Sequence, residues 1–326
     1  MPVLVTGGAG YIGSHMVLEL LARGEETLIV DNLSTGFRWA VAEGARLTIG
    51  NAGDEDLVAA LIEKHGIDAI IHFAGSIVVP DSVRDPLGYY LNNTVNSRSL
   101  LAAAIRGGVK HFIFSSTAAV YGIPGTSPVD EEMPLAPISP YGSSKMMTET
   151  MLRDTAAAHG LSYAALRYFN VAGADPQGRT GQSTPEATHL IKVAAQAALG
   201  QRPRLDIFGT DYDTPDGTCV RDYIHVSDLV AAHSAALDHL RGGGKNLTVN
   251  CGYGRGYSVR EVVKAVKKIS GVDFPVNETA RRDGDPPELV AANRRILEAL
   301  DWAPRHDDLD FIVRTALDWE RRLAGR

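Results

Sequence analysis

The sequence predicts an α/β fold that combines a doubly wound parallel sheet with a smaller, irregular α/β region in the C-terminal half. Three observations lead to this prediction. Short apolar segments alternate with helical stretches through the first half of the chain, a glycine-rich loop follows the first of these segments, and the alternation ends after about Asn170. Strand, helix and strand repeated in this way are typical of parallel sheets with helices on both faces.

Six segments are predicted to be strands because they are nearly continuously apolar, as expected where both faces of a parallel sheet are buried. They are Val3–Thr6, Thr27–Val30, Leu47–Ile49, Ala69–Ala74, Phe112–Ser116 and Tyr163–Phe169. Stretches with helical periodicity lie between most of them, including Tyr11–Arg23 and Asp54–His65. The crossovers in such strand–helix–strand units are right-handed.

The helix that begins after Ser139 is delimited by its own residues. Ser139 can cap the first turn, Pro140 suits the first helical position, and Gly160 can end the helix. Beyond Asn170, residues 171–189 and 200–220 are rich in Gly, Pro, Asp and Thr and are predicted to be long loops, which are usually functional. Further helices are predicted at Thr188–Leu199, Val226–Leu240, Val259–Ser270 and Asp308–Leu323.

The composition excludes several classes of protein. The chain has 326 residues, 44% hydrophobic and 22% charged, and so is not expected to be disordered, collagen-like or a coiled coil. Because 32 Lys and Arg stand against 39 Asp and Glu, the net charge is −7, and we expect no nucleic-acid partner. Cys219 and Cys251 lack metal-ligand spacing, so we expect no metal site and no disulfide framework.

The N-terminal segment MPVLVTGGAGYIG lacks the charged and apolar regions of a secretory signal. No apolar run approaches the ~18 residues that a membrane span needs. We therefore expect a cytoplasmic protein with no membrane partner.

The glycine loop is the first candidate site. Gly7, Gly10 and Gly13 follow the first predicted strand and open the first predicted helix, whose free N–H groups suit a diphosphate. Asp31 ends the second predicted strand, 18 residues after Gly13, where a carboxylate accepts hydrogen bonds from the adenosine ribose and repels a 2′-phosphate. This context predicts a Rossmann sheet that binds NAD rather than NADP. The alternative is a glycine turn that only packs tightly.

These patterns suggest two domains. We assign residues 1–170 to an NAD-binding Rossmann domain and residues 171–326 mainly to a substrate domain. A segment of about 220–245 is expected to return to the Rossmann sheet.

A second candidate site combines Tyr141, Lys145 and Thr117. Tyr141 and Lys145 are four residues apart in the first turns of the capped helix, so their side chains share one face. A neighbouring ammonium favours the phenolate, which a tyrosine needs to act as a general base. Thr117 follows a predicted strand, at the edge where doubly wound sheets bind ligands, and can hydrogen-bond a substrate oxygen. The chemistry indicated is hydride transfer between nicotinamide and an alcohol carbon; a surface Tyr and Lys are the alternative.

At these residues the chain resembles the extended short-chain dehydrogenase/reductase superfamily and, within it, the UDP-glucose (UDP-galactose) 4-epimerases. The resemblance covers nearly the whole chain. It rests on TGGAGYIGSH, Asp31–Leu33, His72–Gly75, Asn92–Asn93, Phe114–Gly122, the Tyr141/Lys145 pair, Ala165–Ala174, Phe208–Leu229 and Arg281–Pro286. It implies interconversion of UDP-galactose and UDP-glucose by reversible hydride transfer from sugar C4 to a tightly bound NAD, through a 4-keto sugar. It also implies a homodimer formed by helices that begin near Tyr89 and at Pro140.

The resemblance also implies a role for individual residues. Thr117, Tyr141 and Lys145 would be catalytic and would contact NAD. The other implied cofactor contacts are Gly7, Gly10, Tyr11, Ile12, Gly13, Asp31, Asn32, Asn51, Ala52, Phe73, Ala74, Gly75, Asn92 and Phe169. Substrate contacts would come from Thr117, Tyr141, Asn170, His189, Arg221, Arg282 and Asp285. Arginines suit a diphosphate because the guanidinium donates hydrogen bonds in pairs.

Five positions depart from common family residues: Thr117 replaces Ser, Asn51 replaces Asp, Ile77 replaces Lys, His189 replaces Asn, and Leu289 replaces Tyr or Cys. Thr117 keeps the hydroxyl, and Asn51 keeps an acceptor for the adenine amino group. Leu289 leaves acceptance of an N-acetyl group open.

Other functions remain alternatives. The pocket motifs also fit a UDP-pentose (xylose/arabinose) or UDP-N-acetylhexosamine 4-epimerase. A sugar-nucleotide dehydratase is disfavoured because Ala118 and Ala119 stand where elimination requires an Asp-Glu pair. A non-catalytic NAD-binding regulator would not need Thr117, Tyr141 and Lys145 together.

Overall fold

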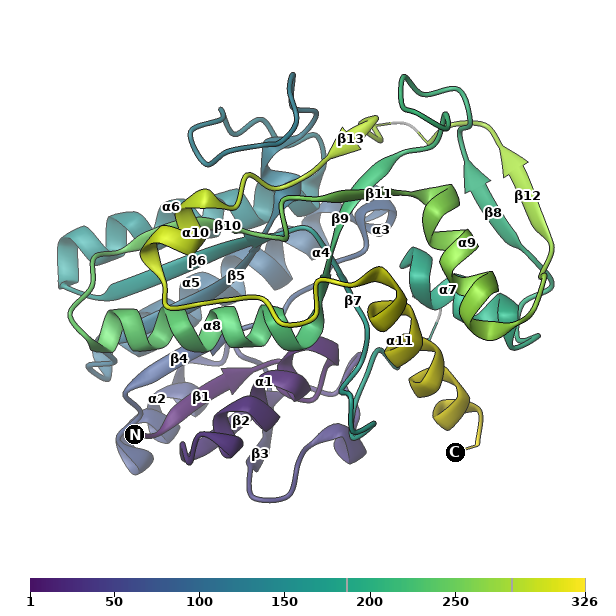
Figure 1. Ribbon diagram of the computed structural model, residues 1–326. Coiled ribbons are helices and arrows are strands. Elements are labelled where there is room, and N and C mark those ends of the chain that lie inside the picture. Colours follow the sequence, from purple (N-terminus) through teal and green to yellow (C-terminus); the bar gives the residue numbers. More distant parts are fainter. Residues whose placement is uncertain (186, 283, 326) are drawn as a thin grey trace.

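The computed structural model describes residues 1–185, 187–282 and 284–325, and its main sheet confirms the expected parallel α/β fold (Figure 1). The main sheet contains β1 (Val3–Thr6), β2 (Thr27–Asp31), β3 (Arg46–Ile49), β4 (Ala69–His72), β5 (His111–Thr117), β6 (Ser162–Tyr168) and β10 (Leu247–Cys251). All neighbours pair in parallel, in the order β10-β6-β5-β4-β1-β2-β3.

Helices cover both faces of this sheet. On one face lie α2 (Glu55–His65), α5 (Asn96–Arg106) and α6 (Pro140–His159), and on the other lie α1 (Tyr11–Ala22) and α8 (Val226–Arg241) (Figure 1). Strand β1 shows why its sequence is continuously apolar. Leu4 belongs to the core under α2, α5 and α6, whereas Val3 and Val5 belong to the core under α1 and α8, and all three side chains are fully buried.

The ends of α6 confirm the capping residues expected from the sequence. The Ser139 Oγ accepts a hydrogen bond from the Gly142 backbone N–H at 3.2 Å, and Pro140 is the first helical residue. Gly160 ends the helix in the left-handed conformation, with φ +72°. The start of α6 is thereby fixed beside the C-terminal end of β5.

The C-terminal half adds two small sheets to the fold. One small sheet contains β7 (Asn170–Ala172), β9 (Val220–His225), β11 (Gly256–Ser258) and β13 (Glu288–Leu289), while β8 (Leu205–Phe208) pairs with β12 (Val276–Thr279). The helices α7 (Leu190–Ala198), α9 (Val259–Ser270) and α11 (Leu309–Ala324) pack against one another. The chain also returns to the main sheet, because α8 packs on α1 and β10 pairs with β6.

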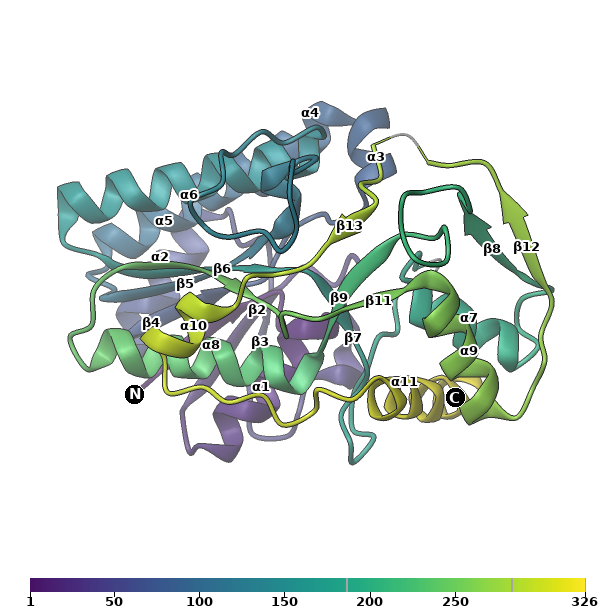
Figure 2. The same cartoon turned by 45° about the horizontal axis from the view of Figure 1, so that its top comes forward.

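Short helices lie in the connections between these elements. They are η1 (Arg38–Ala40), α3 (Val79–Arg84), α4 (Pro86–Tyr89), the π-helix η2 (Tyr90–Val95), η3 (Ala118–Tyr121) and α10 (Arg294–Ala299). Figure 2 shows α3 and α4 beside the N-terminal end of α6. Within the described ranges, no helix is long and apolar enough to cross a membrane, and no cluster of three or more His, Cys, Asp or Glu suits a metal ion.

Candidate active site

One large cavity of about 1520 Å³ lies at the C-terminal ends of the main-sheet strands, where parallel sheets bind ligands. Nearly all of the residues singled out in the sequence line it: Gly7, Gly10, Tyr11, Ile12, Gly13, Asp31, Asn32, Asn51, Ala52, Phe73, Ala74, Gly75, Asn92, Thr117, Tyr141, Phe169, Asn170, His189, Arg221, Arg282 and Asp285. Ile77 and Leu289 line it too, while Lys145 lies behind this wall. Asp283, within the segment Arg281–Pro286, lies outside the described residues.

The glycine loop packs tightly on itself and against the segment after β4. Gly7 has φ +72°, and a Cβ there would stand 2.7 Å from the Ala74 nitrogen; a Cβ on Gly13 would stand 2.1 Å from the Gly7 oxygen. Gly10 precedes α1 without a side-chain cap, and no acidic residue occupies the first turn. The first N–H groups of α1 therefore remain available, which fits the diphosphate of a dinucleotide.

Asp31 is held in place by the backbone around it. Its Oδ2 accepts a hydrogen bond from the Ala9 N–H at 2.9 Å, and its Oδ1 accepts one from the Leu33 N–H at 2.8 Å. Leu33 adopts φ +59°, which folds the loop back over the carboxylate. The carboxylate is thus fixed on the cavity wall at the end of β2, the position expected for a ribose acceptor.

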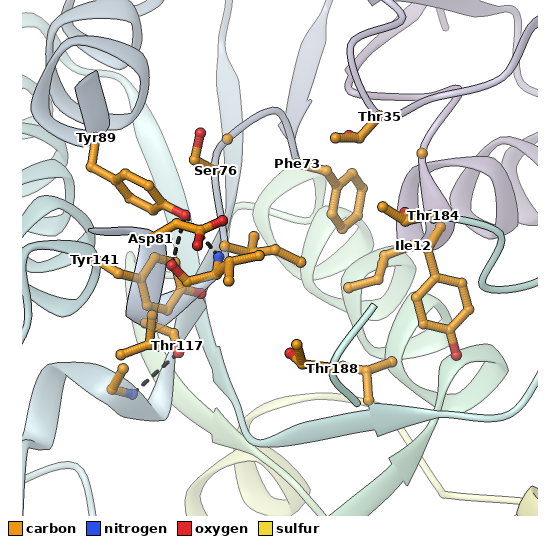
Figure 3. Close-up of a pocket in the computed structure, with 18 of the residues that line it drawn as sticks. Ile12, Thr35, Phe73, Ser76, Asp81, Tyr89, Thr117, Tyr141, Thr184 and Thr188 are labelled. Atoms are coloured by element: carbon orange, nitrogen blue, oxygen red, sulfur yellow. Dashed lines mark hydrogen bonds between the residues drawn. The ribbon is translucent and has the colours of Figure 1, made fainter. Parts of the chain in front are cut away.

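Tyr141 and Thr117 form the polar end of the cavity, with Tyr89 beside them, while Ile12, Thr35, Phe73 and Thr184 lie on the other side (Figure 3). Burial raises the pKa of Tyr141 to about 12, and a hydrogen bond with the Thr117 side chain opposes that rise. A further source of positive charge is therefore needed before this phenol can serve as a base at neutral pH.

Lys145 is a buried cation one turn of α6 after Tyr141, behind the cavity wall. Its Nζ donates a hydrogen bond to the Ser115 carbonyl oxygen at 3.0 Å and lies 4.9 Å from the centre of the Phe114 ring. The side chain is buried, and burial lowers the pKa of Lys145 to about 8, against the opposing effect of Glu149. Lys145 is therefore mainly in its ammonium form near neutral pH.

Ser76 and Tyr89 line the cavity without having been singled out in the sequence, and Asn93, named there only within the motif Asn92–Asn93, holds Ser76 in place. On the π-helix η2, the Asn93 Nδ2 donates to the Ser76 carbonyl at 2.9 Å and to the Ser144 Oγ at 3.0 Å, while its Oδ1 accepts from the Ser76 N–H at 2.8 Å. Tyr89 bonds both backbone groups of Val78. These contacts tie the cavity-lining loop after β4 to α6. The signal available in the sequence was a second asparagine next to Asn92. Its place on a π-helix is in keeping with a functional site, because π-helices often mark such sites.

The second half of the cavity is cationic and aromatic. Arg221 is mostly buried and lies 3.4 Å from the Asp285 carboxylate, and its guanidinium also donates to the Val220 carbonyl at 2.8 Å. The Arg282 guanidinium lies 3.6 Å from the centre of the Phe208 ring. Two fork-shaped donors on one wall suit a diphosphate.

His189 and Asn170 complete this wall. Burial, with a contribution from Lys192, lowers the pKa of His189, so the ring is neutral near neutral pH. Its Nδ1 lies 3.4 Å from the Gln182 amide nitrogen. Asn170 begins β7, directly after the aromatic residue Phe169.

Known proteins with similar sequences and structures agree with this geometry. Residues 3–252 match the NAD-dependent epimerase/dehydratase family. The chain is 60% identical to a UDP-glucose 4-epimerase of Azospirillum brasilense, over 98% of this chain and 92% of that protein.

Two solved structures share the fold over nearly their whole length. UDP-glucose 4-epimerase from Brucella ovis in complex with NAD is 46% identical with a TM-score of 0.95, covering 97% of each chain. UDP-glucose 4-epimerase from Stenotrophomonas maltophila with bound NAD and formylated UDP-arabinopyranose is 39% identical with a TM-score of 0.96, covering 100% of this chain and 99% of that one.

Proposed function

Because this chain belongs to the NAD-dependent epimerase/dehydratase family, we propose that it is a UDP-glucose 4-epimerase, an isomerase that interconverts UDP-galactose and UDP-glucose. The observation that carries this proposal is the single cavity in which a glycine cradle, the Thr117/Tyr141 pair and the arginine pair face one another. The cofactor is NAD, and the Asp31 carboxylate at the end of β2 favours it over NADP.

The residues at the polar end of the cavity transfer the proton of the sugar 4-hydroxyl. Tyr141 takes the proton from the sugar 4-hydroxyl and later returns it, while Thr117 hydrogen-bonds the same oxygen. Lys145 stabilises the phenolate through its positive charge. Bound NAD supplies the acceptor for the C4 hydride and the donor that returns it to the opposite face.

Of the remaining cavity residues, some would hold the UDP part of the substrate and others would leave the sugar free to rotate. Arg221, Arg282 and Asp285 would hold the diphosphate and the uridine, which keeps the 4-keto sugar tethered. Ile77 and Leu289 are apolar and make no directional bond with sugar hydroxyls. The sugar can therefore turn about its link to the diphosphate between the two hydride transfers.

We further assign the chain to a homodimer in the cytoplasm. Six apolar side chains on α3, α4, η2 and α6 are exposed: Val79, Val83, Leu87, Leu91, Val95 and Met147. Leu87 is 78% exposed and Leu91 59%. Leu87, Leu91 and Val95 follow one another at four-residue spacing along α4 and η2, which forms an exposed stripe suited to a second copy.

Substrate assays of the purified protein test the proposed function. The protein is incubated without added NAD with UDP-galactose, UDP-N-acetylgalactosamine or UDP-xylose in separate tubes, and the anomeric protons are followed by NMR. Formation of UDP-glucose from UDP-galactose establishes the reaction and a retained cofactor. If only UDP-xylose reacts, the protein is an epimerase whose substrate is a UDP-pentose rather than UDP-galactose. A product that has lost water would identify a dehydratase. No reaction after NAD is added would refute an epimerase.

A further inference from the structure

Three side chains of α6 meet three consecutive residues of β5. Tyr141 contacts Thr117, and one turn later Lys145 Nζ donates to the Ser115 carbonyl at 3.0 Å. After a further turn, the Glu149 Oε1 accepts a hydrogen bond from the Ser116 Oγ at 2.5 Å. Glu149 is therefore the third member of a row that begins with the two residues of the proton-transfer site.

Glu149 also forms a bidentate ion pair with Arg167 on β6. The Arg167 Nε lies 2.9 Å from Oε1, and one terminal nitrogen lies 2.6 Å from Oε2. Both side chains are under 10% exposed. A buried ion pair recovers its desolvation cost only with good geometry, so simple stabilisation is a weak explanation for charged residues at this depth.

The far side of Arg167 is held as firmly. Its second terminal nitrogen donates to the Tyr121 hydroxyl at 3.0 Å, and that hydroxyl donates to the Asn250 Oδ1 at 2.7 Å. Asn250 in turn donates from its side chain to the Val129 carbonyl at 2.8 Å. The carboxylate of Glu149 thus cannot turn away without breaking a connected buried network.

We propose that Glu149, fixed by Arg167, is a positioning residue that sets α6 against β5 and provides the counter-charge for the Lys145 ammonium. Only the effect of this role on turnover depends on the proposed function. The charge relationship itself belongs to the resting protein and can be measured there.

The groups around Lys145 support this assignment. On α6, Tyr141 has its pKa raised to about 12, and on β4, burial lowers the pKa of His72 to about 3, so both are neutral near neutral pH. Burial also raises the pKa of Tyr168 on β6. Besides burial, Glu149 is the group that acts on the pKa of Lys145, and it raises it. Arg167 is the remaining charge, held on the far side of the carboxylate.

Two variants of the NAD-loaded protein test the proposal, because they should shift the pKa of Lys145 in opposite directions. With lysine labelled at ¹³Cε, NMR titration follows the pKa of Lys145, identified by the resonance missing from Lys145→Met. Glu149→Gln removes the counter-charge and should lower this pKa by about one pH unit or more. Arg167→Met removes the opposing cation and should raise it. Loosened packing would admit water and raise the pKa in both variants.

The outcomes separate this inference from the proposed function. A pKa of Lys145 that is unchanged or raised in Glu149→Gln, or lowered in Arg167→Met, overturns the counter-charge role. Glu149→Gln decides alone if Arg167→Met does not fold, because only its expected shift is opposite in sign to that of loosened packing. Glu25→Gln removes a carboxylate paired with Arg241 far from the cavity and should leave the pKa of Lys145 unchanged. Failure of epimerisation in the wild-type protein would refute the function without affecting these titrations.

Discussion

The Thr117 and Tyr141 side chains lie together at the polar end of the cavity, although one residue ends β5 and the other lies in the first turn of α6. The Ser139 cap and Pro140 fix where α6 begins. Thr117 is held in place as the last residue of β5, where it pairs with Tyr168 of β6. A shared substrate oxygen can therefore contact both hydroxyls without a rearrangement of the backbone.

Tyr141→Phe should lose epimerisation by about 10²-fold or more, because it removes the group that carries the proton and keeps the ring that packs there. Bound NAD should be retained, since the glycine cradle is untouched. The measurement is turnover of UDP-galactose together with the NAD content of the denatured protein. Thr117→Ser, which keeps a hydroxyl, is the matched control and should stay active. Near-normal turnover of Tyr141→Phe would falsify the assignment.

The sequence was sufficient to predict six strands of the main sheet and a group of residues that line the cavity, because those signals are local. Continuous apolar strands, a glycine loop after β1 and the spacing of Tyr141 and Lys145 each act within one or two elements. Strand β10 was missed because its sequence LTVNC includes a polar residue, Asn250, whose buried partner Tyr121 lies 129 positions away.

The missing parts of the site share that cause. In the sequence, Glu149 and Arg167 cannot be told from surface charges. Their ion pair is buried because α6 packs against β6 in the folded chain. The contacts of Asn93 were not predicted because helical periodicity does not reveal a π-helix, and because its partner Ser144 lies on another helix. Long-range pairing, rather than local propensity, decides these positions.

Arg221→Met should weaken binding of the UDP-sugar rather than the chemical step. The guanidinium lies on the cavity wall beside Asp285, away from Tyr141, and a charge-assisted hydrogen bond is worth about 1.5–3 kcal/mol, so KM should rise by about 10- to 100-fold. Steady-state kinetics with UDP-galactose, at saturating substrate, should give a kcat within a few-fold of wild type. A fall in kcat at unchanged KM would instead place Arg221 in the transition state.

The double variant Leu87→Glu/Leu91→Glu should be monomeric. Both side chains belong to the exposed apolar stripe, and four carboxylates across a two-fold interface would repel one another and remain desolvated. Light scattering after size exclusion gives the mass directly. Leu297→Glu, a 45%-exposed leucine on α10, is the control and should remain dimeric. A wild-type monomer, or a dimer that survives the double substitution, contradicts this interface.

His72 should make the protein less stable in mild acid. Burial, followed by the charge of Lys145, lowers the pKa of His72 to about 3, and both ring nitrogens are already bonded, Nδ1 to the Thr6 Oγ1 at 2.6 Å and Nε2 to the Ser97 Oγ at 2.9 Å. An unfolded histidine titrates near 6.5, so below that pH the unfolded chain binds a proton that the folded chain does not. The stability associated with neutral His72 is complete above about pH 6.5 and is lost progressively as the pH falls toward 3.

Urea unfolding of the NAD-loaded protein at pH 7, 6 and 5 measures this dependence. In His72→Asn the free energy of unfolding should fall less steeply with decreasing pH than in wild type, by up to about 1.4 kcal/mol for each pH unit below 6.5, because one fewer proton is taken up on unfolding. The remaining slope has other sources, since burial also lowers the pKa of His15 and of His233 to about 4. His159→Asn changes an exposed histidine at the end of α6 and should keep the wild-type slope. Equal slopes for wild type and His72→Asn would mean that His72 takes up its proton while the protein is still folded.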